Sequence, residues 1–363
     1  MSTTERVARA QRAAAAAGLD AILVTPGADL RYLTGYAAMP LERLTCLVVP
    51  ASGHPTLVVP KLERPAAEAA GAGAVAEIVD WPETADPIAT VARLLPAASR
   101  VGLDDHMWAE KVLRFRAAMP RAEQVLAGTV LSELRVRKDD DEIQALREAG
   151  AAIDRVHARM EEWLRPGRTE REIARDIADA IVAEGHVRAD FVIVASGPNS
   201  ASPHHETSDR VVAAGDPVVV DIGGTTEAGY CSDETRTYAV GEPPGHYREA
   251  YAALLAAQVA ACDHARAGVT AESVDAAARS VLEDAGLGTY FIHRTGHGIG
   301  LETHEEPYIV AGNSTVLEPR MAFSIEPGFY VEGRYGARIE DIVVTTADGV
   351  ERLNLRPREL VVL

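Results

Sequence analysis

The 363-residue sequence has few aromatic residues, few cysteines and fewer positive than negative charges. Aromatic side chains make up 5% of the residues, so a hydrophobic core must be built mainly from Ala, Val, Leu and Ile. The three cysteines are widely spaced and odd in number, which does not fit a disulfide framework. The 36 basic and 54 acidic residues leave a net charge of −18, which argues against binding to nucleic acid or to an anionic membrane surface.

Long apolar runs are also missing. No segment approaches the roughly 20 apolar residues that a membrane-spanning helix requires. The charged N-terminal segment is not followed by the apolar core of a signal peptide. We therefore expect a soluble, cytoplasmic protein. A chain of this length, with 47% apolar residues, is long enough to bury a large core and to divide into two domains.

Strand and helix patterns alternate in the first third of the chain, which indicates an α/β domain. Short apolar runs bounded by turn residues predict the strands, and apolar residues at helical spacing predict the helices. The expected helices cover 5–17 and 86–96, and the expected strands cover 21–25, 46–50, 56–60, 76–81 and 100–105. No group of catalytic side chains is recognisable there, so we expect the chemistry in the rest of the chain.

Two segments of the second part are similar to each other. Residues 165–185 align with 266–286 at an offset of 101, with Arg, Gly, Thr and Gly matching in the same order. Each segment follows another expected helix, at 139–164 and at 246–265. In both, the threonine is placed to cap a helix. The similarity predicts a duplicated helix–helix–sheet unit, with two ordinary helix pairs as the alternative.

Five side chains of metal-binding type stand in apolar or glycine-rich runs of the last 150 residues: Asp221, Asp233, His297, Glu326 and Glu340. A carboxylate in a low-dielectric interior costs several kcal/mol unless a cation or hydrogen bonds compensate it. Converging carboxylates also repel each other. A divalent cation removes both difficulties, so this set predicts a metal site.

Two expected hairpins bring the four acids together. Glycine-containing turns fold the segment from Asp221 to Asp233 into one hairpin, and a turn at 333–336 folds the segment from Glu326 to Glu340 into another. Any one of these acids, taken alone, is more often a salt-bridged structural residue. Four of them in two hairpins, with a histidine between, favour a metal centre instead.

The composition of the set argues for two ions. Four carboxylates and one imidazole are hard ligands, which favour Mn, Co, Fe or Mg over a thiolate-type zinc site. They also outnumber the three protein ligands of an ordinary catalytic zinc. Two divalent ions that share carboxylates fit better, because such a pair makes hydroxide available near neutral pH. This reasoning leaves the identity of the ions open among Mn²⁺, Co²⁺, Fe²⁺ and Mg²⁺.

Further polar residues are candidates for contacts to a substrate. His204 and His205 lie in a loop that contains Pro and Asn, and His293 and His304 lie on either side of the expected ligand histidine. Each of them alone is more often a surface or hydrogen-bonded core histidine. Near a metal centre, imidazoles stabilise an oxyanion or hold a substrate carboxylate. Arg338 suits the second role as a fixed cationic fork.

These residues stand in motifs that resemble those of the pita-bread metallopeptidases that act on proline bonds, the Xaa-Pro dipeptidases (prolidases) and Xaa-Pro aminopeptidases. The motifs are SGPNSASPHH, VVVDIGG, GYCSDETRT, HRTGHGIGLETHEEP, SIEPGFY and RIEDIVV. The resemblance covers essentially the whole chain. It implies a creatinase-type N-terminal α/β domain over 1–128. It further implies an α+β pita-bread catalytic domain with an internal pseudo-twofold repeat over 129–363.

The resemblance also assigns roles to the metal ligands. Asp221 would bind one ion, Asp233 and Glu340 would bridge two ions, and His297 and Glu326 would complete the second ion. Glu326 would in addition carry a proton from the nucleophile toward the leaving amine. With the resemblance, Mn²⁺ is the first choice for the two divalent ions, with Co²⁺, Fe²⁺ or Zn²⁺ as the others.

The other roles implied by the resemblance concern the substrate. His204 and His304 would stabilise the tetrahedral intermediate. His293, Arg338 and Tyr330 would shape the pocket on the proline side.

One spacing departs from the family pattern. Asp221 and Asp233 are 12 positions apart, where the family usually has 11. We expect the additional residue in the turn at 223–227, because a hairpin turn absorbs an insertion without displacing the ligands.

The activity implied is hydrolysis of the Xaa-Pro bond in dipeptides or short proline-containing peptides. A dipeptidase is favoured over an aminopeptidase because the two-domain chain is compact, and a homodimer is expected. The alternative is a metal-dependent hydrolase of a small non-peptide amide, similar to ectoine hydrolases and creatinases. A non-catalytic binding module on the same fold is disfavoured because all five ligands are present.

Overall fold

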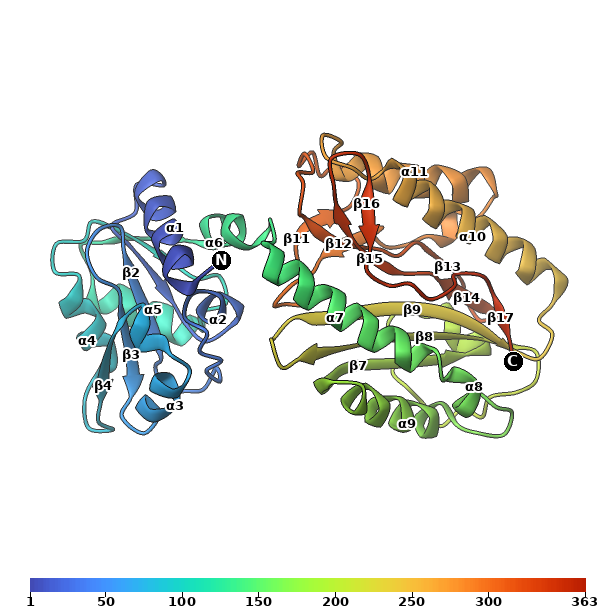
Figure 1. The fold of residues 1–363 in the computed structure, drawn as a ribbon, viewed down its shortest axis with the longest axis horizontal. Helices are drawn as coiled ribbons and strands as arrows, with labels where there is room; N and C mark the ends of the chain where they lie inside the picture. The colour runs from blue at the N-terminus through green and yellow to red at the C-terminus, as the bar shows by residue number, and fades with distance from the viewer. The chain divides into compact units, whose positions relative to one another are not determined.

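The computed structural model describes residues 1–363, which form two compact units, Met1–Arg135 and Val136–Leu363. Each unit has its own hydrophobic core. In Figure 1 the first unit runs from blue to green and the second from green to red. None of the helices combines the length and the apolar character needed to cross a membrane.

The first unit contains a mixed six-stranded sheet with the order β4-β3-β2-β1-β5-β6. β2 pairs antiparallel with β1 and with β3, and the remaining neighbours are parallel. The elements are α1 (Thr3–Ala16), β1 (Ala21–Val24), α2 (Ala28–Thr34), β2 (Cys46–Pro50), β3 (Thr56–Pro60), α3 (Arg64–Ala69), η1 (Ala72–Ala74), β4 (Glu77–Trp81), α4 (Pro87–Leu94), β5 (Arg100–Leu103), α5 (Ala109–Ala118), β6 (Glu123–Leu126) and α6 (Gly128–Arg135).

All the elements predicted for this unit are present. The first helix ends at Ala16, and Gly18 beyond it has a φ of +68°, which is the backbone region that favours glycine. The two apolar runs at 46–60 form the expected antiparallel hairpin. The patterns missed α2, α3, η1, α5, β6 and α6, whose short apolar stretches are not periodic enough to be recognised.

The second unit contains two sheets and a separate hairpin. One sheet has the order β17-β9-β8-β7, the other has the order β11-β10-β12-β15-β16, and β13 pairs with β14. Its elements are α7 (Asp140–His157), α8 (Met160–Trp163), α9 (Glu170–Ala183), β7 (His186–Ser196), η2 (Gly197–Ala201), β8 (Asp216–Thr226), β9 (Cys231–Val240), α10 (Gly245–His264), α11 (Ala271–Asp284), η3 (Gly288–Tyr290), β10 (Gly296–Gly298), β11 (Glu305–Ile309), β12 (Ala322–Ile325), β13 (Gly328–Val331), β14 (Tyr335–Arg338), β15 (Asp341–Thr345), β16 (Val350–Arg352) and β17 (Val361–Val362).

Helices cover one face of the β7–β9 sheet, and the other face carries Asp221 and Asp233. Val218, Val220 and Ile222 of β8 belong to a core shared with α7 and α9, which lie beside these strands in Figure 1. Because side chains alternate along a strand, Asp221 and Gly223 face away from these helices. The helices α10 and α11 contribute to a second core with β12 and β15.

The two similar segments occupy equivalent places in this unit. Thr169 and Thr270 are the N-cap residues of α9 and α11, and each forms one β-bridge with a later segment. Only Thr169 caps with its side chain, in a capping box with Glu172. The equivalent residue of α11 is Ser273, whose hydroxyl donates to the Thr270 carbonyl at 2.7 Å instead.

One predicted helix is interrupted. The expected helix at 139–164 begins with the predicted capping box at Asp139, but α7 ends at His157 and α8 follows after a short turn. The His157 ring lies 2.9 Å from the Tyr238 hydroxyl in the core. The turn then directs Trp163 of α8 into the same core.

Candidate metal centre

The five predicted ligands line one cavity of about 650 Å³ in the second unit. They come from both sheets. β8 and β9 carry Asp221 and Asp233, β10 carries His297, Glu326 follows β12, and Glu340 lies between β14 and β15. The cavity therefore gathers side chains that are up to 119 positions apart in the sequence, from Asp221 to Glu340.

The register of the β8–β9 ladder places the first two carboxylates. Asp221 pairs with Thr235, and Gly223 pairs with Asp233, so the two aspartates lie diagonally on the same face. The ladder runs without a shift as far as Thr225. Residues 223–226, which were expected in the turn, therefore belong to β8, and the turn begins at Glu227. An additional residue in that turn leaves the pairing at both aspartates intact.

Glycines on either side of His297 let neighbouring strands approach it closely. A Cβ atom on Gly296 would lie 1.9 Å from the Ser324 carbonyl oxygen, and one on Gly298 would lie 2.2 Å from the Glu306 carbonyl oxygen. The His297 backbone N–H donates to the Ser324 hydroxyl at 3.0 Å. The close packing of β11 and β12 thus requires glycine on both sides of His297, and this packing holds the imidazole between the two strands.

The hydrogen bond at one ring nitrogen of His297 determines whether the other nitrogen carries a proton or a lone pair. Nδ1 lies 3.1 Å from the Gly298 carbonyl oxygen, so it carries the proton. Burial lowers the pKa of His297 to about 3, which keeps the ring neutral. Its Nε2 lone pair then faces Glu326 Oε1 at 3.3 Å and Asp233 Oδ2 at 3.7 Å. Acceptors that face each other in this way need a proton or a metal cation between them.

The carboxylates of the cavity also lack compensating positive charge and hydrogen-bond donors. Burial, followed by the nearby Glu340 and Asp221 carboxylates, raises the pKa of Asp233 well above its usual range. Burial likewise raises the pKa of Glu340, and that of Glu326 to about 7. Asp221 Oδ1 and Glu340 Oε1 are buried without a hydrogen-bond partner. Divalent cations fit this donor set.

Two hydroxyl groups orient ligand carboxylates. Thr235 Oγ1 donates to Glu340 Oε2 at 2.7 Å, and Ser324 Oγ donates to Glu326 Oε1 at 3.2 Å. Partners of this kind fix the direction in which a ligand points. The sequence analysis did not single out either residue. The period of two along a strand was a usable signal, because Thr235 follows Asp233 by two positions.

Arg338 lies against the cluster at full burial. Its Nη2 lies 2.5 Å from Asp221 Oδ2, and its Nε donates to Thr235 Oγ1 at 3.1 Å. Nη1 donates to the Tyr330 hydroxyl at 2.7 Å and to the Pro203 carbonyl at 3.3 Å. These bonds use four of the five guanidinium N–H groups and leave one on Nη2.

His293 and Tyr330 support this arginine. His293 Nε2 lies 2.9 Å from the Tyr330 hydroxyl, and its Nδ1 lies 2.7 Å from the Arg294 carbonyl oxygen. Burial and the neighbouring Arg338 lower the pKa of His293 to about 3. His293 lines the cavity, whereas Tyr330 does not and lies behind Arg338 and His293.

The other predicted histidines divide between two places. His204 and His304 line the cavity, and the His304 ring centroid lies 3.9 Å from that of His297. His205 does not line the cavity, because its Nε2 lies 2.8 Å from Glu170 Oε2. The sequence analysis missed six lining residues: Asp190, Phe191, Ile193, Pro203, Arg294 and Thr303.

The fully buried Glu170 carboxylate organises the loop that carries His204. Its oxygens accept hydrogen bonds, at 2.6 to 3.2 Å, from Ser196, Asn199, His205 and Ser208. Burial alone would raise the pKa of Glu170, but the hydrogen bonds from Ser208 and Ser196 outweigh it and hold the pKa at about 2.

Glu170 gives the fold a predictable dependence on acid. Its folded pKa of about 2 lies below the ordinary value of 4.5, so its stabilising effect is complete above pH 4.5 and is lost as the pH falls toward 2. We expect the wild-type free energy of unfolding to fall by about 2 kcal/mol more than that of Glu170→Gln between pH 6 and pH 3. Urea unfolding after chelation measures this difference. An equal pH dependence of the free energy of unfolding in the wild type and in Glu170→Gln would contradict this expectation. So would an equally large difference between the wild type and the exposed control Glu161→Gln.

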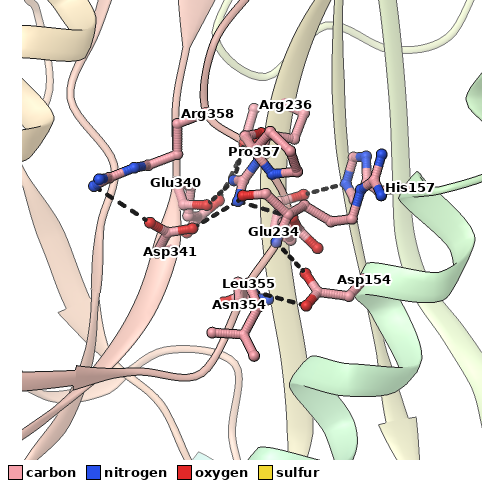
Figure 2. A network of polar contacts seen from close by, with 12 residues as sticks. Asp154, His157, Glu234, Arg236, Glu340, Asp341, Asn354, Leu355, Pro357 and Arg358 are labelled. Carbon is pink, nitrogen blue, oxygen red and sulfur yellow. Dashed lines mark hydrogen bonds and ion pairs between the residues drawn. The ribbon is translucent and has the colours of Figure 1, made fainter.

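A second polar network lies on the other face of β9 (Figure 2). Arg236 Nη2 lies 2.7 Å from Asp341 Oδ1 and 3.1 Å from Glu234 Oε1. Its Nη1 donates to the Glu340 carbonyl at 2.5 Å, and its Nε donates to the Pro357 carbonyl at 3.0 Å. This guanidinium thus ties the backbone of a candidate ligand to β9 and to the C-terminal segment.

Comparison with known proteins follows the same division into two units. Residues 6–137 match the creatinase/prolidase N-terminal domain, and residues 144–347 match metallopeptidase family M24. A structure of dipeptidase PepE from Mycobacterium ulcerans is 54% identical and has a TM-score of 0.94, covering 99% of this chain and 97% of the other.

Two further relatives carry prolidase names. A structure of a prolidase from Thermococcus sibiricus is 38% identical, with a TM-score of 0.94 and full coverage of both chains. An Xaa-Pro dipeptidase of Lactobacillus delbrueckii subsp. lactis is 37% identical over 357 residues, which is 95% of each chain. With the geometry above, these matches confirm the resemblance seen in the motifs: the chain belongs to metallopeptidase family M24 and is a hydrolase of the pita-bread prolidase type with a creatinase/prolidase N-terminal domain.

Proposed function

We propose that this metallopeptidase hydrolyses the Xaa-Pro bond of dipeptides with two divalent ions, Mn²⁺ being the first choice. The observation that carries the proposal is the cavity in which four carboxylates and one neutral imidazole meet with too few hydrogen-bond donors. Asp221, Asp233, His297, Glu326 and Glu340 would hold the ions, with Asp233 and Glu340 shared between them. When bound, the ions acidify a water molecule and polarise the peptide carbonyl.

The residues around the ions have separate tasks in this proposal. Glu326, oriented by Ser324, would move a proton toward the leaving amine. His204 and His304 line the cavity and would donate to the developing oxyanion. Arg338, with its remaining N–H, would bind the prolyl carboxylate.

The proline side of the pocket would lie around Arg338. His293 lines the cavity there, and Tyr330 keeps both side chains in place through its hydroxyl. The relatives named dipeptidase PepE and Xaa-Pro dipeptidase support a dipeptidase over an aminopeptidase.

Hydrolysis of matched peptides tests the proposal. We would compare Leu-Pro, Leu-Pro-Gly and Leu-Ala with Mn²⁺ added and after chelation. Metal-dependent cleavage of Leu-Pro alone is the expected result, and cleavage of Leu-Pro-Gly would make the enzyme an Xaa-Pro aminopeptidase. If no peptide is cut although metal binds, the hydrolase of a small non-peptide amide replaces this proposal.

A further inference from the structure

A β-bulge in β7 turns a carboxylate into the cavity. Ala189 pairs with Gly224 and Phe191 pairs with Gly223, so Asp190 is an additional residue in the β7–β8 ladder. Such a bulge interrupts the alternation of side chains and re-aims the residue that it adds. Asp190 and its neighbour Phe191 both line the cavity, although regular alternation would place one of them on the opposite face.

Two donors hold the Asp190 carboxylate in place. Arg188 Nε lies 2.5 Å from Oδ1, and Thr225 Oγ1 donates to Oδ2 at 2.5 Å. An ionised carboxylate accepts about four hydrogen bonds, so Asp190 has capacity for another donor. The Arg188 side chain is 67% exposed. Solvent around the guanidinium weakens this ion pair, so the Asp190 carboxylate, whose side chain is 18% exposed, still attracts a second cation.

Asp190 and Arg338 contact β8 at two positions that are separated along the strand. Asp190 contacts Thr225, whereas Arg338 contacts Asp221. Thr225 and Asp221 are on the same face of the strand and four residues apart, which corresponds to about 13 Å. Asp233, opposite Gly223, lies between them. The cavity therefore has a cation at one end, a carboxylate at the other and the candidate metal ligands between.

This spacing decides which substrate group reaches Asp190. The extended backbone of a dipeptide is only about 7 Å long, so its α-ammonium group does not reach Asp190 while its carboxylate lies on Arg338. A side chain with a four-carbon stem and a terminal ammonium covers the remaining distance. Such a side chain also passes along the apolar Phe191 and Ile193, which line the same cavity.

We propose that Asp190 is a specificity-determining residue that binds the basic side chain of a lysine or arginine preceding the proline. This inference rests on the proposed Xaa-Pro hydrolysis and adds the substrate class to it. Arg294 is the other charged residue of the cavity outside the metal cluster and Arg338. Its guanidinium lies over the Tyr308 ring, 4.5 Å from the centroid, and 3.4 Å from His304 Nδ1. If Arg294 selected the side chain instead, an acidic residue before proline would be preferred.

Three dipeptides distinguish these cases: Lys-Pro, norleucine-Pro, which keeps the stem without the charge, and Glu-Pro. We expect wild-type kcat/KM for Lys-Pro to exceed that for norleucine-Pro at least about tenfold, the effect of one charge-assisted hydrogen bond. In Asp190→Asn this ratio should fall to about one. The control is Asp209→Asn, a surface residue paired with Arg171, which should keep the wild-type ratio.

The outcomes separate this inference from the proposed function. Wild-type enzyme that cleaves norleucine-Pro as well as Lys-Pro, or that prefers Glu-Pro, would overturn the role of Asp190 without any variant being needed. An equal loss of kcat/KM for Lys-Pro and norleucine-Pro in Asp190→Asn would mean that Asp190 only links β7 to β8 and does not select the side chain. Wild-type enzyme that cleaves none of the three peptides would remove the proposed function, and this inference with it.

Discussion

Replacing Asp233 with asparagine should abolish hydrolysis and leave the fold intact. The residue is 4% exposed, and its carboxylate shares the cavity with three others. Asparagine keeps the shape but not the charge that a divalent ion requires. The ions are worth several kcal/mol in the transition state, and a loss of about 4 kcal/mol lowers kcat about a thousandfold.

Metal-dependent stability gives a readout that does not depend on activity. A ligand at a hundred times its Kd stabilises a folded protein by about 2.7 kcal/mol. We expect added Mn²⁺ to raise the melting temperature of the wild type and of Asp284→Asn, an exposed control in α11. The Asp233→Asn protein should melt as a folded protein and respond weakly or not at all. Full activity of Asp233→Asn would refute the proposed metal centre.

Replacing Arg236 with methionine should destabilise the second unit by about 3–5 kcal/mol, because it leaves buried charge without its partner. Asp341 is completely buried and Arg236 is 3% exposed. Arg352 and Gln258 still contact Asp341 in the variant, at 2.8 and 3.0 Å. Neither of them reaches the carbonyl groups that Arg236 binds on the backbone of Glu340 and the C-terminal segment.

A matched surface pair provides the control for Arg236. Arg147 pairs with Glu351 at 2.6 Å, with both side chains more than a third exposed, so Arg147→Met should cost no more than about 1 kcal/mol. Urea unfolding of the chelated proteins measures both changes, and an unchanged m-value would show that the unfolded states are comparable. A similarly small decrease in the free energy of unfolding of Arg236→Met and Arg147→Met would show that the Arg236 network does not stabilise the unit.

The five candidate ligands were predictable because the signals are local. Asp221 and Asp233 each stand in an apolar strand pattern, and a hairpin is inferred from the glycine turns between such strands. His297 has glycines on both sides because strands pack against its backbone. In each case the unusual feature is a charged or polar side chain in a segment that reads as buried.

Other residues of the site were not predictable because their roles depend on distant partners. Glu170 begins a helix and reads as an exposed N-terminal acid. It is buried because the loop at 196–208 folds back over it. Asp190 reads as an ordinary strand residue, since a bulge depends on the pairing of two strands and not on the sequence of one. Tyr330 was expected in the pocket, but Arg338 and His293 separate it from the cavity.

Ligand type, strand period and turn chemistry are properties of short segments, and they were enough to predict the fold class, the two hairpins and the five candidate ligands. The registers between strands, the burial of Glu170 and the pairing of Arg236 with Asp341 depend on contacts between segments about 30 to 100 positions apart. Those contacts form only when the second unit packs. The free energy of a buried charged side chain depends on the partners around it, and these partners come from other segments of the chain.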